Sequence, residues 1–288
     1  MPVWQGWLPV LVLPPLTCLA ARGLPQWALM WLLAVSIYAG LKWLTWRRTP
    51  SPGTSIARHM AYLLAWPGLD ARAFLAETSD AVVRPSLGEW VFAAGKLLAG
   101  LVCFYLAHRI IPSGYDLLLG WTGMIGVVFA LHFGLFHLLS CFWRSRGVAA
   151  APLMDWPIAS RSLTEFWGRR WNTAFRDLAH RFLFLPFAHA LGPRWGLLAG
   201  FLFSGLVHDA VISLPAGGGF GGPTLYFVIQ PLGMLLQRSP TGRAIGLARG
   251  WSGWLVTALV LTLPAGLLFH PPFVRNIVLP FMSALGAH

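Results

Sequence analysis

A histidine and an aspartate, His208 and Asp209, stand next to each other inside an apolar run that extends from Phe201 to Ile212. An imidazole can take a proton from a hydroxyl group near neutral pH, so His208 is a candidate general base. Ser204 precedes it by four residues, which places both side chains on one face of a helix. Ser204 would then either orient the imidazole or simply allow a neighbouring helix to approach closely.

Burial alone does not decide the role of His208. Ionisable residues within apolar helices are costly, and they generally face a bundle interior or an aqueous cavity and mark function. A structural histidine bonded to a carbonyl of a neighbouring helix would give the same sequence pattern. His132 and His137 are five positions apart, off the i, i+4 spacing of a two-histidine metal site. We therefore predict no metal ligands.

An asparagine, Asn172, ends the aromatic and basic stretch Trp167-Gly-Arg-Arg-Trp-Asn172. Its amide could bond a reacting oxygen, although an asparagine here is also typical of local hydrogen bonding. The two arginines have the forked geometry that suits the phosphates of a donor such as coenzyme A. They would equally suit anionic lipid headgroups. The candidate substrate-binding residues are Trp167, Arg169, Arg170, Trp171, Ser204 and Asp209.

The composition of the chain indicates that most of it lies in a lipid bilayer. The chain is 57% hydrophobic and only 10% charged, with a mean hydropathy of +0.65, far from the balance of a soluble domain. Its net charge of +12 is not accompanied by a basic, aromatic domain outside the membrane, so we predict no nucleic-acid partner. The GxSxG, HExxH and P-loop motifs are missing from the sequence, which argues against hydrolase, zinc protease and ATPase functions.

The apolar runs predict an all-α, polytopic membrane bundle of about seven spans, with a range of six to nine. The first span is broken by prolines and the sixth is short, and the N-terminus lacks the basic region of a cleaved signal, so we expect the first span to be retained. The whole chain, 1–288, is predicted to be one domain. The expected spans are 4–21, 26–45, 89–111, 115–142, 195–214, 223–237 and 251–270.

Basic residues predict the orientation of the spans. With a cytoplasmic N-terminus, the loops at 46–88, 143–194 and 238–250 are cytoplasmic and carry most of the 21 Lys and Arg residues. Only Arg22 and two others then lie outside, as the positive-inside rule requires. We expect a multi-pass protein of the cytoplasmic membrane of a bacterium.

The loop at 143–194 is too long for a simple connection and is expected to be structured. Ser162-Leu-Thr-Glu165 has the form of a capping box, which predicts a helix that begins at about Leu163. The mixture of aromatic residues and arginines that follows is typical of an interfacial amphipathic helix, and we place Asn172 on it.

These motifs together resemble the membrane-bound O-acyltransferase superfamily, and its wax synthase branch matches best. The resemblance rests on Ser162-Leu-Thr-Glu-Phe-Trp-Gly-Arg-Arg-Trp-Asn172, on Ser204-Gly-Leu-Val-His208, and on Tyr62-Leu-Leu-Ala-Trp-Pro-Gly-Leu-Asp70. It covers residues 60–237. The motifs are specific for the family when they occur together, whereas each motif alone is not. The glutamate expected after the family histidine is replaced by Asp209, which puts a role for that carboxylate in doubt.

The resemblance implies that an acyl group passes from a thioester to the hydroxyl of a lipophilic alcohol. Acyl-coenzyme A, or an acyl carrier protein, would be the donor and co-substrate, with no tightly bound cofactor. His208 matches the family histidine and Asn172 its asparagine. A low-dielectric site keeps imidazole neutral, as a general base must be. Asn172 or a backbone amide would stabilise the oxyanion, and we expect direct transfer without an acyl-enzyme.

Two other functions are compatible with the same residues. A proton-coupled transporter would use His208 and Asp209 as a relay, although the spans lack a matched pair of broken helices. A non-catalytic relative would bind a lipid or a partner. The sequence leaves the alcohol, the acyl length and the oligomeric state open.

Overall fold

The computed structural model describes residues 4–287, and within that range every regular element is helical. Contacts divide the chain into two compact units, Met154–Val274 and a unit formed by Met1–Leu153 with Arg275–His288. The single domain expected over 1–288 stays a prediction, because compactness alone does not decide whether the units fold independently.

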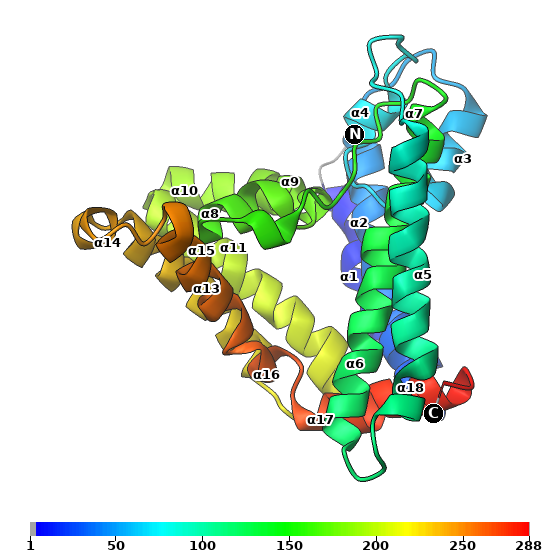
Figure 1. Cartoon of the computed structure of the whole chain (residues 1–288). Helices are drawn as coiled ribbons and strands as arrows, with labels where there is room; N and C mark the ends of the chain where they lie inside the picture. The colour runs from blue at the N-terminus through cyan, green and yellow to red at the C-terminus, as the bar shows by residue number, and fades with distance from the viewer. Residues whose placement is uncertain (1–3, 288) are drawn as a thin grey trace. The chain divides into compact units, whose positions relative to one another are not determined.

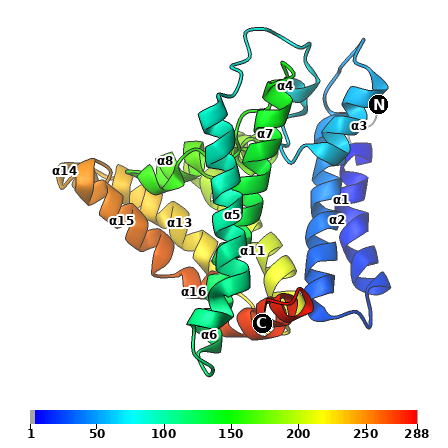
Figure 2. The same cartoon turned by 45° about the vertical axis from the view of Figure 1, so that its right-hand side comes forward.

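Helical hairpins build the first unit. Figure 2 shows α1 and α2 antiparallel and side by side, and Figure 1 shows α5 beside the long helix that α6 begins. Ser86 starts α5 by accepting a hydrogen bond of 3.1 Å from the Glu89 amide, which satisfies a backbone donor at the helix N-terminus. The elements are α1 (Trp4–Ala20), α2 (Gln26–Arg47), α3 (Ile56–Ala65), α4 (Ala71–Leu75), α5 (Leu87–Ile110), α6 (Asp116–Val128), η1 (Phe129–Leu135), α7 (Phe136–Arg144) and α18 (Leu279–Ala284).

Glycines let α5 and the α6–η1 helix approach closely. A Cβ on Gly100 would lie 2.3 Å from the Ala130 nitrogen, and one on Gly126 would lie 2.8 Å from the Gly100 oxygen. Without a hydrophobic driving force between helices in lipid, such small-residue seams allow the van der Waals packing that holds them together. The seam therefore fixes the long hairpin of this unit.

The segment from Tyr62 to Asp70 is held by a buried lysine of α2. Lys42 Nζ donates to the Gly68 carbonyl at 2.6 Å and lies 3.4 Å from the centroid of the Tyr62 ring. Asp70 then caps α4 by accepting from the Ala73 amide at 3.0 Å. These contacts give the segment a structural role in the first unit, because the Gly68 carbonyl and the Tyr62 ring both hold the buried nitrogen of Lys42.

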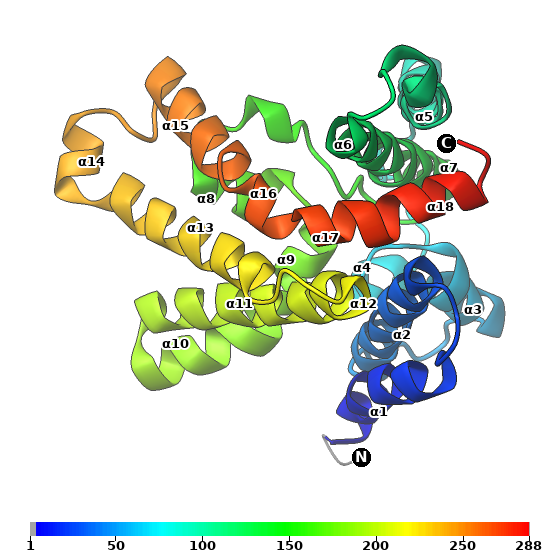
Figure 3. The same ribbon diagram turned by 90° about the horizontal axis from the view of Figure 1, so that it is seen from below.

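The second unit is formed by three long helices with shorter ones across one end. Figures 1 and 3 show α11 beside α13, and the short helices α8 to α10 over the ends from which α11 and α15 start. The elements are η2 (Pro157–Ala159), α8 (Leu163–Glu165), η3 (Phe166–Arg170), α9 (Thr173–Ala179), η4 (His180–Phe184), α10 (Leu185–Leu191), α11 (Pro193–His208), η5 (Asp209–Ser213), α12 (Leu214–Ala216), α13 (Gly222–Arg238), α14 (Pro240–Ala244), α15 (Gly250–Thr262), α16 (Ala265–Leu268) and α17 (Pro271–Phe273). The π-helical η6 (Val274–Val278) follows in the chain.

Five of the seven expected spans coincide with helices that are long and apolar enough to cross a membrane. The protein is thus an all-α, multi-pass membrane bundle, as predicted. The expected first and sixth spans, α1 and α13, are each 17 residues long and fall short of the length that crosses hydrocarbon without adjustment. The five are Gln26–Arg47, Leu87–Ile110, Asp116–Arg144, Pro193–Ala216 and Gly250–Leu268.

Candidate active site

His208 is the last residue of α11, where the α-helix passes into the π-helical turn η5. Its position depends on the close approach of α13, because a Cβ on Gly205 would lie 2.7 Å from the Thr224 Cα. π-Helical turns are rare and are frequent at functional sites. The half-buried imidazole thus sits at a local irregularity in a closely packed helix pair.

Hydrogen bonding determines which nitrogen of His208 is free. Its Nδ1 lies 2.7 Å from the backbone oxygen of Ser204, and a carbonyl oxygen can only accept, so Nδ1 carries the proton. In the neutral ring Nε2 then keeps its lone pair. No hydrogen bond to Nε2 occurs among residues 4–287. This nitrogen is the one available to take a proton.

Ser204 orients His208, but it does so through its backbone. The contact is made by the Ser204 carbonyl and not, as predicted from the i, i+4 spacing, by the side chain. A change of side chain at Ser204 would therefore leave the contact atom in place, while Gly205 next to it provides the close helix approach.

A cluster of aromatic side chains lies beside His208, on the side that faces α13. The imidazole and the buried Phe227 ring have centroids 4.3 Å apart. The Trp167 ring of η3 packs beside Phe227, with ring centroids 5.7 Å apart, and beside Phe201 of α11, with ring centroids 5.5 Å apart. Its indole donates to Gln230 Oε1 at 3.3 Å. Trp167 thus joins the Ser162–Asn172 motif to the helices that carry His208.

The Asp209 carboxylate faces the start of α13. Its Oδ1 accepts from Ser213 Oγ and the Gly221 amide, each at 2.9 Å, and its Oδ2 accepts from the Thr224 amide at 3.0 Å and from the Thr224 hydroxyl. An anion at a helix N-terminus is stabilised by the free amides and by the helix dipole. We infer that Asp209 anchors η5 to α13. Its predicted role in substrate binding has no support from these contacts and stays a prediction.

His270 extends this network and was not singled out from the sequence. The Phe273 amide donates to His270 Nδ1 at 3.2 Å, so the ring proton is on Nε2, which lies 3.2 Å from Ser213 Oγ. The Ser213 hydroxyl in turn donates a hydrogen bond to Asp209 Oδ1 at 2.9 Å. Burial lowers the pKa of His270, partly offset by Asp209, and favours this neutral form. Only the fold brings His270 to Asp209, so no local pattern could have revealed it.

Asn172 corrects the expectation of one continuous interfacial helix. The helix that begins at Leu163, capped by the Ser162 hydroxyl at 3.1 Å from the Glu165 amide, ends at Arg170. Asn172 has a φ of 42°, in the left-handed region that asparagine tolerates better than most residues. It caps α9 by accepting from the Phe175 amide at 3.5 Å. The segment is therefore two helices with a corner at Asn172.

The corner separates Asn172 from the contacts of His208. The backbone N–H of Asn172 donates to the sulfur of Met154 at 3.2 Å. Within residues 4–287, Asn172 forms no hydrogen bond with His208. Trp171 stacks on Phe166, with ring centroids 5.4 Å apart, and so contributes to the corner. Its role in substrate binding stays a prediction. A catalytic role for Asn172 stays a prediction.

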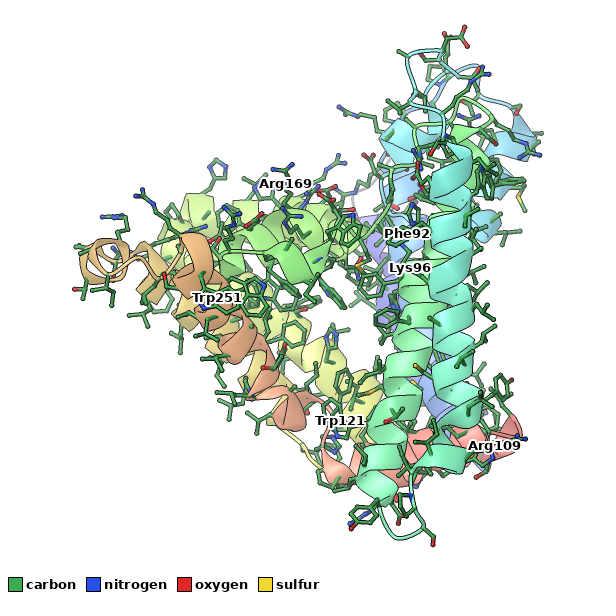
Figure 4. The ribbon with its side chains drawn as sticks, viewed as in Figure 1. Phe92, Lys96, Arg109, Trp121, Arg169 and Trp251 are labelled. Atoms are coloured by element: carbon green, nitrogen blue, oxygen red, sulfur yellow. The ribbon has the colours of Figure 1, made fainter. Side chains whose placement is uncertain are left out.

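The two arginines of the motif differ in their surroundings. Arg170 is half-buried and donates to Glu165 Oε1 at 2.7 Å and to the Asp155 carbonyl at 3.1 Å. Burial raises the pKa of Glu165, but hydrogen bonds from Arg161 and Arg170 outweigh it and hold the pKa below its ordinary value. Arg169 points outward in Figure 4 and has a side chain 74% exposed, 4.0 Å from Asp155. Arg169 is the more available of the two for a ligand.

The first unit contains a polar cluster that the sequence analysis missed. Ligand atoms of Glu89, His137 and Cys141 lie within 4.8 Å of one another. Two cations occupy the same place, since Lys96 Nζ lies 2.7 Å from His137 Nδ1 and Arg144 pairs with Glu89. Their charge opposes a divalent ion, and we assign the cluster to ion pairing between α5 and α7. Lys96 is labelled in Figure 4.

Replacing Trp167 by leucine is expected to lower the free energy of unfolding by about 2 kcal/mol, because the contacts with Phe201 and Phe227 are lost and Gln230 loses a donor. Trp167→Phe keeps a ring and loses only the indole N–H, so we expect about 1 kcal/mol. Denaturant unfolding in detergent measures both. Equal stability of the leucine variant and the parent protein would contradict the contact group.

Comparison with known proteins places the site residues in a family segment. Residues 150–229 match the sequence model of the Membrane bound O-acyl transferase family. This segment contains Asn172, Ser204, His208 and Asp209. The match confirms the resemblance drawn from the motifs.

Curated relatives agree with the family match. The long-chain-alcohol O-fatty-acyltransferase of Simmondsia chinensis is 29% identical over 143 residues, which are 45% of this chain and 40% of that protein. Two probable long-chain-alcohol O-fatty-acyltransferases of Arabidopsis thaliana, numbers 2 and 7, are 30% and 26% identical over 46% and 45% of this chain. The aligned residues cover only 41% and 42% of those two proteins. The match thus spans about two fifths of these relatives.

Proposed function

We propose that this chain, a relative of the membrane-bound O-acyltransferases, transfers an acyl group from a thioester to the hydroxyl of a lipophilic alcohol within the membrane. Acyl-coenzyme A is the proposed donor, with an acyl carrier protein as the other candidate, and the product is an ester of the wax type. The similarity to long-chain-alcohol O-fatty-acyltransferases supports this choice of reaction.

The observation that carries the proposal is the free Nε2 of His208. Its neighbour Nδ1 is committed to the Ser204 carbonyl, which holds the ring in one tautomer and one orientation. A general base needs a lone pair that is held in position, since a misplaced group loses much of the rate. The Phe227 ring on one face of the imidazole restricts its rotation further.

The proposed reaction balances at His208. The alcohol gives its proton to Nε2 as its oxygen attacks the thioester carbonyl carbon. The carbon–sulfur bond of the tetrahedral intermediate then breaks, and the imidazolium returns the proton to the leaving thiolate. His208 ends in its starting state, so no acyl-enzyme is needed.

Asn172 remains the candidate donor to the oxyanion. Its Oδ1 accepts from the Phe175 amide, which leaves the Nδ2 protons without a partner among residues 4–287. An amide donor of this kind can stabilise the charge that develops on a carbonyl oxygen.

The contacts of Asp209 favour an enzyme over a proton-coupled transporter. Oδ1 of Asp209 accepts from Gly221 just before α13, and Oδ2 accepts from Thr224 in its first turn. Asp209 has no hydrogen bond to His208 among the described residues. A relay through the two residues would have to break that anchor.

We place the N-terminus in the cytoplasm of a bacterium and the protein in its inner membrane. The basic loops support this orientation through the positive-inside rule. The donor would then approach from the cytoplasm, and the alcohol through the bilayer.

Ester synthesis by the purified full chain tests the proposal. The protein in nanodiscs is given radiolabelled palmitoyl-coenzyme A and a panel of long-chain alcohols, and labelled ester is measured by chromatography. We expect ester only with both substrates present. The absence of ester with every alcohol and with both donor types would refute the proposed function. Proton uptake by proteoliposomes without a donor would support a transporter.

A further inference from the structure

A cavity of roughly 500 Å³ lies in the second unit, away from His208. This volume falls within the range of about 300 to 1,000 Å³ that holds small ligands. Three arginines and one glutamate line it: Arg161, Arg170, Arg249 and Glu165. With three positive charges and one negative charge, the lining has a net charge of +2.

Two of these arginines form no close ion pair with a carboxylate in the described part of the chain. Arg170 pairs with Glu165 at 2.7 Å, whereas the guanidinium groups of Arg161 and Arg249 form no hydrogen bond or ion pair within residues 4–287. Both side chains are exposed. Like charges that converge on one cavity repel each other unless an anion lies between them, and they focus a positive potential there.

The walls of the cavity are held in place by contacts within the second unit. Trp254 Nε1 donates to the Ile158 carbonyl at 2.7 Å, and a Cβ on Gly253 would lie 2.4 Å from the Arg161 oxygen. Gln237 Oε1 accepts from the Leu163 amide at 2.9 Å. The capped turn before α8 and the start of α15 are therefore joined by contacts of the chain itself.

We propose that this cavity binds phosphate groups, with Arg161 and Arg249 as the principal contacts. Guanidinium groups bind phosphate oxygens in bidentate pairs, and a multiply charged anion can satisfy both arginines at once. Gly250, which opens α15, also lines the cavity, and its helix end has no side-chain cap. The phosphates belong either to a soluble nucleotide thioester or to a phospholipid headgroup.

The use of this cavity for the donor rests on the proposed function, but phosphate binding does not. The nucleotide end of coenzyme A carries several phosphates on an otherwise polar body. Binding it here would shift the phosphate contact from Arg169 and Arg170, considered above from the sequence, to Arg161 and Arg249.

Binding of adenosine 3′,5′-bisphosphate to the full chain in phosphatidylcholine nanodiscs tests the proposal by calorimetry. We expect saturable binding, weakened about tenfold or more in Arg161→Gln/Arg249→Gln, because two charge-assisted contacts are lost. The control Arg181→Gln/Arg243→Gln removes the same charge from exposed arginines outside the cavity and is expected to bind within about twofold of the parent protein. Arg161→Lys/Arg249→Lys should retain more binding than the glutamine pair.

Unchanged binding by Arg161→Gln/Arg249→Gln, or no saturable binding by the parent protein, would overturn the proposal. Nanodiscs that contain phosphatidylglycerol distinguish the two phosphate sources. Competition by this lipid, relieved in the glutamine pair, assigns the cavity to headgroups, and its absence assigns the cavity to the soluble nucleotide. If the parent protein binds adenosine 3′,5′-bisphosphate in this cavity but makes no ester, the phosphate site is supported and the proposed function is refuted.

Discussion

His208→Ala is expected to lower the rate of ester formation by a factor of about 10² to 10⁴, the range that a positioned general base contributes. The loss should appear in kcat, because the alanine variant still has the cavity and the apolar helices that we propose as the binding regions for donor and alcohol. Radiolabelled ester formation in nanodiscs measures it.

A second histidine provides a matched control. His132 lies in the apolar helix of the first unit, and its Nδ1 is buried without a hydrogen-bond partner. His132→Ala removes a comparable imidazole from an apolar helix, and we expect ester formation within about twofold of the parent protein. His208→Ala with full activity would refute the catalytic assignment. A histidine with a purely structural role predicts equal losses in the two variants, accompanied by lower stability.

Asp209→Asn is expected to destabilise the protein by about 2 to 4 kcal/mol, because at least one oxygen that accepts two hydrogen bonds becomes an amide donor facing other donors. The lost charge at the start of α13 adds to this effect. Denaturant unfolding in detergent measures the change. Ester formation should fall together with stability, since η5 no longer holds the end of α11 against α13.

Thr224→Val gives the graded comparison. It removes one hydroxyl donor to Asp209 and keeps the backbone contact, so we expect a loss of about 1 kcal/mol. A relay or substrate-binding role for Asp209 predicts a different pattern, in which Asp209→Asn abolishes function and leaves the unfolding midpoint unchanged. That pattern would contradict the anchoring role.

Local rules made parts of the site predictable. Ser162 was predicted to begin a helix, and it does so because capping depends only on residues three positions apart. Its box is modified, however, since the Glu165 carboxylate accepts from the Arg161 amide at 2.8 Å and not from that of Ser162. The continuous helix predicted beyond it was wrong at Asn172, because helix periodicity carries no information on where one residue adopts a left-handed backbone.

The sequence by itself was sufficient to predict that the protein lies in a membrane, where its main spans are, and which histidine is the candidate base. Long uncharged runs can satisfy their backbone in lipid only as helices, so composition and length were sufficient to predict them. His208 was found in the same way, as an ionisable residue in an apolar run.

Only the tertiary structure decided what these residues contact. The anchor of Asp209 on Thr224 and the indole of Trp167 on Gln230 depend on how helices pack. The meeting of Arg161 with Arg249 around one cavity depends on it as well. The carbonyl that fixes the His208 tautomer is four residues away on the same helix, and the structure decided only that it is the backbone of Ser204 that makes the contact. Helix periodicity relates residues three and four positions apart, whereas most of these partners are brought together by close approaches between separate helices.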